Sequence, residues 1–125
     1  MKTTKDLYKK LIKLPNLHSI PELKDNVIIW NLYKKAYIEA SCEDDDATIN
    51  IVSNSKLKGC LMHWHPYDEK DTLEILYELG KKGNILVLRH NLISASTVYF
   101  GRPSKYQFDK NKKWHYGLLT YLEQK

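Results

Sequence analysis

A strand that runs directly into a capped helix occupies the middle of the chain and constrains the fold most. Residues 58–65 alternate as a strand does, and in extended backbone their side chains form two faces, with Cys60, Met62 and Trp64 on one and Leu61, His63 and His65 on the other. Pro66 ends the strand because proline has no N–H to donate to a sheet. Asp68 is a good N-cap for a helix over about 69–81. We expect the face with Cys60 to lie in the core.

A first helix is predicted over about 4–14. Thr3 or Thr4 can cap it, and Pro15 ends it because proline restricts the residue before it. The apolar residues between these limits recur at helical spacing, and they are Leu7, Tyr8, Leu11 and Ile12. The lysines occupy the opposite side of this helix.

Several further segments have the alternation of strands. Residues 36–42 and 48–52 flank the polar stretch Glu43-Asp-Asp-Asp46, which predicts a hairpin. Residues 27–35 can be drawn as strand or helix, and we favour strand because β-branched residues dominate the start. The remaining strands are expected at 85–90, 96–100 and about 114–123.

The 125 residues match the usual size of one domain, so we expect residues 1–125 to form a single domain. Short turns between consecutive strands favour antiparallel pairing, with the helices gathered on one face. The predicted fold class is therefore α+β, a mainly antiparallel sheet of five to six strands with two main helices (about 4–14 and 69–81) packed on it.

The location expected from the sequence is the cytoplasm. The longest apolar stretches, 27–30 and 85–88, are too short to cross a bilayer, and the charged N-terminus lacks the apolar core of an export signal. Cys42 and Cys60 lie 18 positions apart and allow one disulfide if their strands are neighbours. Two buried, reduced thiols are the favoured interpretation, since no disulfide framework is present.

The two histidines of the central strand suggest one kind of chemistry, metal binding. Alternate positions on a strand project to the same face, so His63 and His65 could offer paired imidazoles to a transition metal such as zinc. Asp68 could add an oxygen ligand, and His90 or His115 a third nitrogen. The pattern resembles the histidine-rich first strand of metallohydrolases, but no second aspartate–histidine pair follows. The alternative is that both histidines lie on a half-exposed sheet face, that Asp68 only caps the helix, and that there is no cofactor.

Two other site hypotheses have less support. Cys60 lies near two histidines in the sequence but on the expected core face, so an unactivated thiol accounts for it better than a nucleophile. Basic and aromatic residues interleave in 102–108 and 112–116, as in many nucleic-acid-binding segments. The phase of the last strand, however, turns Trp114 and Tyr116 toward the expected core.

A third hypothesis is protein binding. Nine tyrosines and three tryptophans are many for a chain of this length, and these residue types are enriched at interface hot spots. The net charge of +5 favours acidic partners through long-range steering. The candidate partner-binding residues are His63, His65, Tyr67, Arg102, Lys105 and Tyr106.

A small α+β domain with no catalytic constellation and one charged, aromatic face resembles the immunity proteins that bacteria keep beside their toxins. The stretch 59–89 and the closing Tyr116-Gly-Leu-Leu-Thr-Tyr-Leu-Glu123 are also similar in style to small bacterial proteins. The resemblance implies a protein that binds a cognate toxin and blocks its active site. Because this chain is basic, the toxin would present an acidic patch.

Overall fold

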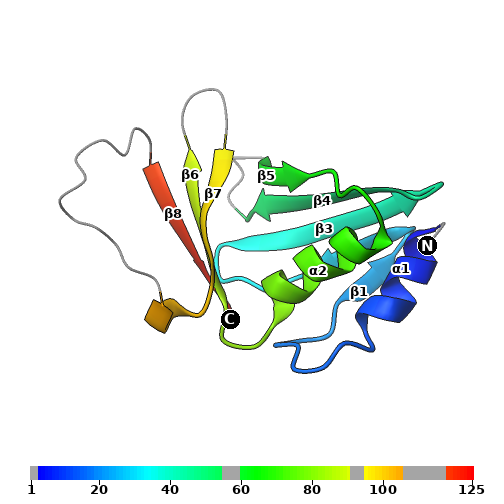
Figure 1. The fold of residues 1–125 in the computed structure, drawn as a ribbon, viewed down its shortest axis with the longest axis horizontal. Coiled ribbons are helices and arrows are strands. Elements are labelled where there is room, and N and C mark those ends of the chain that lie inside the picture. Colours follow the sequence, from blue (N-terminus) through cyan, green and yellow to red (C-terminus); the bar gives the residue numbers. More distant parts are fainter. Residues whose placement is uncertain (1–2, 55–59, 91–94, 106–117) are drawn as a thin grey trace.

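The structure is a computed structural model that describes residues 3–54, 60–90, 95–105 and 118–125 (Figure 1). Its elements are α1 (Thr4–Leu11), β1 (Glu22–Lys24), β2 (Val27–Trp30), β3 (Ala36–Glu43), β4 (Asp46–Ser53), β5 (Cys60–Trp64), α2 (Glu69–Gly80), β6 (Ile85–His90), β7 (Ala95–Gly101), the 3₁₀ turn η1 (Pro103–Lys105) and β8 (Leu118–Glu123). The described strands form a five-stranded sheet in the order β1-β2-β3-β4-β5 and a three-stranded sheet in the order β7-β6-β8. All described pairings are antiparallel.

Two tight turns organise the five-stranded sheet. Asp25 and Asn26 join β1 to β2, while Asp44 and Asp45 join β3 to β4, and all four residues have positive φ angles between 49° and 66°. Positive φ at both central residues is the mark of the two-residue hairpin turn whose twist matches that of the strands. Asp and Asn tolerate this conformation better than other non-glycine residues. The predicted hairpin is therefore confirmed, with a shorter loop than expected.

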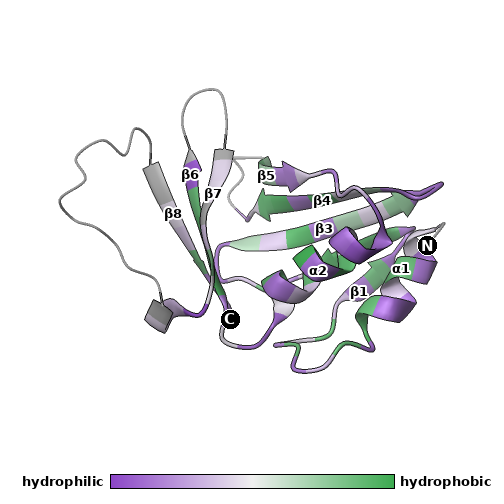
Figure 2. Cartoon of the chain, viewed as in Figure 1, coloured by the Kyte–Doolittle hydropathy of each residue, from purple (hydrophilic) through white to green (hydrophobic). Residues whose placement is uncertain are grey.

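Both helices pack on one face of the five-stranded sheet (Figure 1). Hydrophobic residues recur along β3 and β4 (Figure 2), and alternate residues of these strands are buried. The helices cover that face with fully buried leucines. These are Leu7 and Leu11 of α1 and Leu76 and Leu79 of α2. The alternation in the sequence thus separates a core face from an open face.

The three-stranded sheet extends the same core. Leu86, Leu88 and Leu122 belong to one hydrophobic cluster with the inner face of the larger sheet. Backbone hydrogen bonds near the C-terminus join the connection between β2 and β3 to the end of β8, where Lys34 N donates to Glu123 O (3.0 Å) and Lys125 N donates to Leu32 O (2.9 Å).

The α+β class with two helices is confirmed, and residues 27–30 are a strand as favoured. The division of the strands into two sheets and the short strand β1 were not predicted. The first helix ends at Leu11 rather than near residue 14, because the chain continues in tighter turns in which Lys13 N donates to Lys10 O and Leu14 N to Leu11 O. Residues 114–117 of the predicted last strand lie outside the described residues. No helix in the described part of the chain is long and apolar enough to span a membrane.

Candidate functional site

The edge strand β5 contains a β-bulge, so the residue before the bulge points to a different face of the sheet than strand alternation predicts. Met62 pairs with Ile51 of β4, but the register then shifts and Cys60 pairs with Val52, which leaves Leu61 as an extra residue. A bulge turns the residues beyond it to the opposite face. Cys60 therefore leaves the face of Met62 and Trp64 and is exposed. The prediction that Cys60 is buried in the core is wrong for this reason.

The two cysteines are free thiols in different surroundings. The Cys60 thiol lies 3.1 Å from the carbonyl oxygen of Met62 and 4.0 Å from Oδ1 of Asn50. Cys42 is buried as predicted, and burial raises the pKa of its thiol. The disulfide alternative is not formed.

His63 and His65 lie next to each other on one face, as their alternation predicted, and the structure shows that both are exposed. Their ring centroids are 5.2 Å apart and the ring planes meet at 68°. Trp64 points to the other side of the strand, where it packs against the core, and its ring centroid is 6.4 Å from that of Phe100. The β5 backbone thus holds the two imidazoles outward while Trp64 anchors the strand.

Asp68 is the N-cap of α2, as predicted. Its Oδ1 accepts a hydrogen bond from Asp71 N (2.8 Å), and its carbonyl oxygen accepts one from the Thr72 hydroxyl (2.7 Å). Among the residues that the structure describes, no group of three or more His, Cys, Asp or Glu side chains could hold a metal ion. The His90 side chain and His115 lie outside the described set. The structure therefore brings His63 and His65 together, while the Asp68 carboxylate caps the N-terminus of α2.

Tyr67 is the most exposed large hydrophobic residue of the described chain. Its side chain is 91% exposed, and it lies in the short connection between His65 and α2. A tyrosine in this position buries a large, rigid area when a partner covers it, at a small cost in conformational entropy. Tyr67 and the two histidines follow one another along the chain and form one exposed surface segment.

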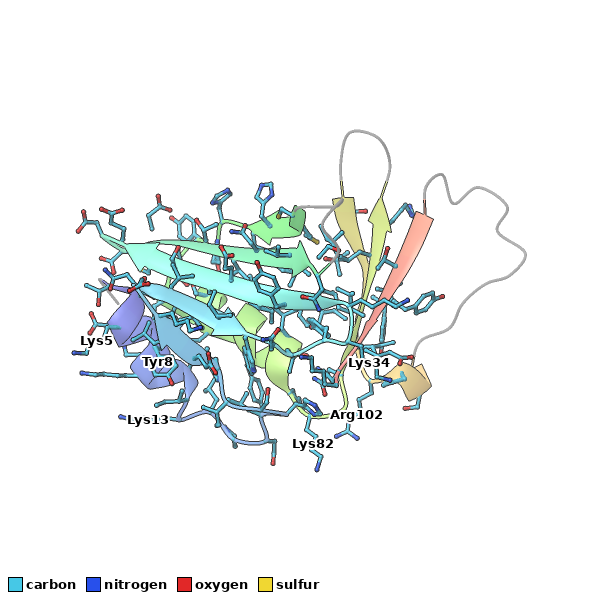
Figure 3. The ribbon with its side chains drawn as sticks, turned by 180° about the vertical axis from the view of Figure 1, so that it is seen from behind. Lys5, Tyr8, Lys13, Lys34, Lys82 and Arg102 are labelled. Carbon is cyan, nitrogen blue, oxygen red and sulfur yellow. The ribbon has the colours of Figure 1, made fainter. Side chains whose placement is uncertain are left out.

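The basic candidate residues occupy a different part of the molecule. Arg102 is exposed between β7 and η1, and Figure 3 shows it at the same end as Lys82. Figure 1 places η1 far from the connection between β5 and α2. Of the other two candidates, the Lys105 side chain and all of Tyr106 lie outside the described residues. Among the described candidates, Arg102 therefore does not share one continuous surface with His63, His65 and Tyr67.

The open face of the larger sheet is a feature that the sequence analysis did not identify. Seen from behind, the strands lie in front of the helices, and no described helix packs on this face (Figure 3). One row of cross-strand partners spans all five strands and ends on the exposed histidine pair, in the order Glu22, Ile29, Glu39, Asn50 and His63. The next row contains Tyr37, Val52 and Cys60.

The side chains of this open face mix aliphatic, aromatic and polar groups. Ile29, Tyr37, Glu39 and Asn50 are half-buried, and the Tyr37 hydroxyl donates to Glu39 Oε2 at 3.5 Å. The strand alternation could have assigned these residues to an outer face, but their alignment into rows requires the register. We define the open face as these two rows together with His65 and Tyr67, the exposed residues that follow His63 along the chain.

Comparisons with models of protein families, with curated proteins and with solved structures found no match.

Proposed function

We propose that this chain is a protein-binding module, a cytoplasmic bacterial immunity protein that binds a cognate toxin and blocks its active site. The observation that carries the proposal is the open face, which no described helix covers and which ends in exposed His63, His65 and Tyr67. A half-apolar sheet face edged by an exposed aromatic residue suits contact with another protein.

The strand pairing that underlies this surface supports a binding role. The residues of both rows are held by antiparallel pairing between neighbouring strands, so little ordering is needed when a partner docks. The net charge of +5 favours a partner with an acidic patch, because long-range attraction accelerates the encounter.

A direct test uses the purified protein and a toxin encoded next to its gene. We expect a stable complex, loss of toxin activity in vitro, and rescue of growth when both proteins are expressed together. Toxin activity that persists in the presence of excess protein would refute the proposed function.

Two substitutions then locate the surface. Tyr67→Ala should weaken toxin binding at least tenfold, since a truncated hot-spot residue costs about 2 kcal/mol or more. Tyr121→Ala is the matched control, because Tyr121 is also an exposed tyrosine but lies on β8 of the smaller sheet. Equal affinities for both variants would remove Tyr67 from the interface without affecting the toxin-inhibition test.

The other two functions stay predictions from the sequence. A metal-dependent enzyme would need ligands or catalytic groups beyond the two histidines that the described structure brings together. Nucleic-acid binding depends on 102–116, of which only 102–105 is described, and it predicts an affinity that falls steeply with salt. Retention on single-stranded DNA at low salt is the measurement that tests it.

A further inference from the structure

We infer that His63 and His65 form a two-ligand surface site for a divalent transition metal such as zinc, nickel or copper. Water would fill the remaining coordination positions. The inference concerns the isolated chain and does not rest on the proposed function. It also differs from the three-ligand site expected from the sequence, because Asp68 has no part in it.

The separation of the two rings fits one shared metal ion. Imidazole nitrogens bind zinc at about 2 Å in tetrahedral geometry, which places the centres of two coordinated rings about 5 Å apart. The observed separation of the His63 and His65 centroids is 5.2 Å. The two rings therefore lie at a separation that matches chelation of one metal ion.

The donor atoms are also accessible. Both histidines are exposed, whereas the Trp64 side chain between them packs on the core and holds the strand in place. The terminal torsion of a histidine has a broad energy minimum, so small ring rotations can direct one nitrogen of each ring to a common point. Pairing of His63 with Asn50 of β4 restrains the backbone during this adjustment.

The chemistry of the pair sets the class of metal. Imidazole suits zinc, copper and nickel, whereas calcium and magnesium prefer oxygen ligands. Two protein ligands give a weaker and more exchangeable site than the four ligands of structural zinc sites. Binding should weaken at acidic pH, because protons compete with the metal for imidazole nitrogen.

The test is a calorimetric titration of the full chain with Zn²⁺, together with His63→Gln and His65→Gln. Each variant should bind at least about tenfold more weakly than the unchanged protein, because loss of one ligand removes the advantage of intramolecular chelation. Glutamine keeps the size and polarity of the side chain, and circular dichroism verifies that each variant folds.

Matched controls separate this pair from other groups. His18→Gln, His90→Gln and His115→Gln should leave the Zn²⁺ affinity unchanged, and so should Asp68→Asn, which retains an N-cap. With substoichiometric Cu²⁺, paramagnetic broadening of NMR signals should be strongest around residues 63–65. Absence of saturable Zn²⁺ binding, unchanged affinity in both His63→Gln and His65→Gln, or an equal loss in a control would overturn the inference.

Discussion

Replacement of Gly80 by alanine tests how tightly α2 packs on the larger sheet. Gly80 is the last residue of α2 and is buried against the indole of Trp30. An added Cβ would overlap Cη2 of Trp30 and lie 2.5 Å from Cζ2 and 2.8 Å from Cζ3. Trp30 has little room to move, because it is 1% exposed and its Nε1 donates to the Ser19 hydroxyl at 2.8 Å. The extra methyl group must therefore displace the helix or the indole.

Opposing effects determine the expected magnitude. Alanine is favoured over glycine within a helix by about 1 kcal/mol, and less at the final position. Overpacking a filled core costs about 1–3 kcal/mol, and loss of the Trp30 hydrogen bond adds about 1 kcal/mol. The steric cost is larger, so Gly80→Ala should lower the free energy of unfolding by about 2 kcal/mol.

Urea denaturation followed by circular dichroism measures this change, and Trp30→Phe provides the second arm of a double-mutant cycle. Phenylalanine lacks the outer part of the indole, so Gly80→Ala should cost little in the Trp30→Phe background, and the coupling should be about 2 kcal/mol. If Gly80→Ala is neutral in the unchanged protein, or equally destabilising in both backgrounds, the steric reasoning is refuted.

Two further predictions concern the end of the chain and the cysteines. Gln124→Ala should lower the free energy of unfolding by about 2 kcal/mol in the same urea assay. The Gln124 side chain accepts a hydrogen bond from Gly83 N (2.9 Å) and donates to Lys81 O (2.7 Å) and Leu79 O (3.3 Å). An unchanged free energy of unfolding would show that water replaces these bonds. Cys60 is exposed and should react with a thiol reagent in the folded protein, whereas buried Cys42 should react only after unfolding. Cys60→Ser should therefore abolish labelling of the folded protein. Two reactive thiols in the folded protein would contradict the burial of Cys42.

The locally encoded elements followed from the sequence. Asp68 was identified as the cap of α2 because capping joins a side chain to a backbone N–H three residues away. The hairpin around Asp44 and Asp45 was evident because a short polar stretch separates two segments that alternate as strands do. The placement of His63 and His65 on one face followed from strand alternation alone. Each of these features depends on residues within a few positions of one another.

Tertiary structure decided the features that depend on pairing between distant segments. Alternation predicts two faces for a strand, but only the register against β4 reveals the bulge at Leu61 that exposes Cys60. The same long-range pairing aligns Glu39, Asn50 and His63 into one row and divides the strands into two sheets. The sequence thus determined that the two histidines share a face, and the tertiary structure determined that this face continues across an open sheet. The physical reason is that side-chain direction is a local property of the backbone, whereas the neighbours of a side chain are set by which strands pair and in which register.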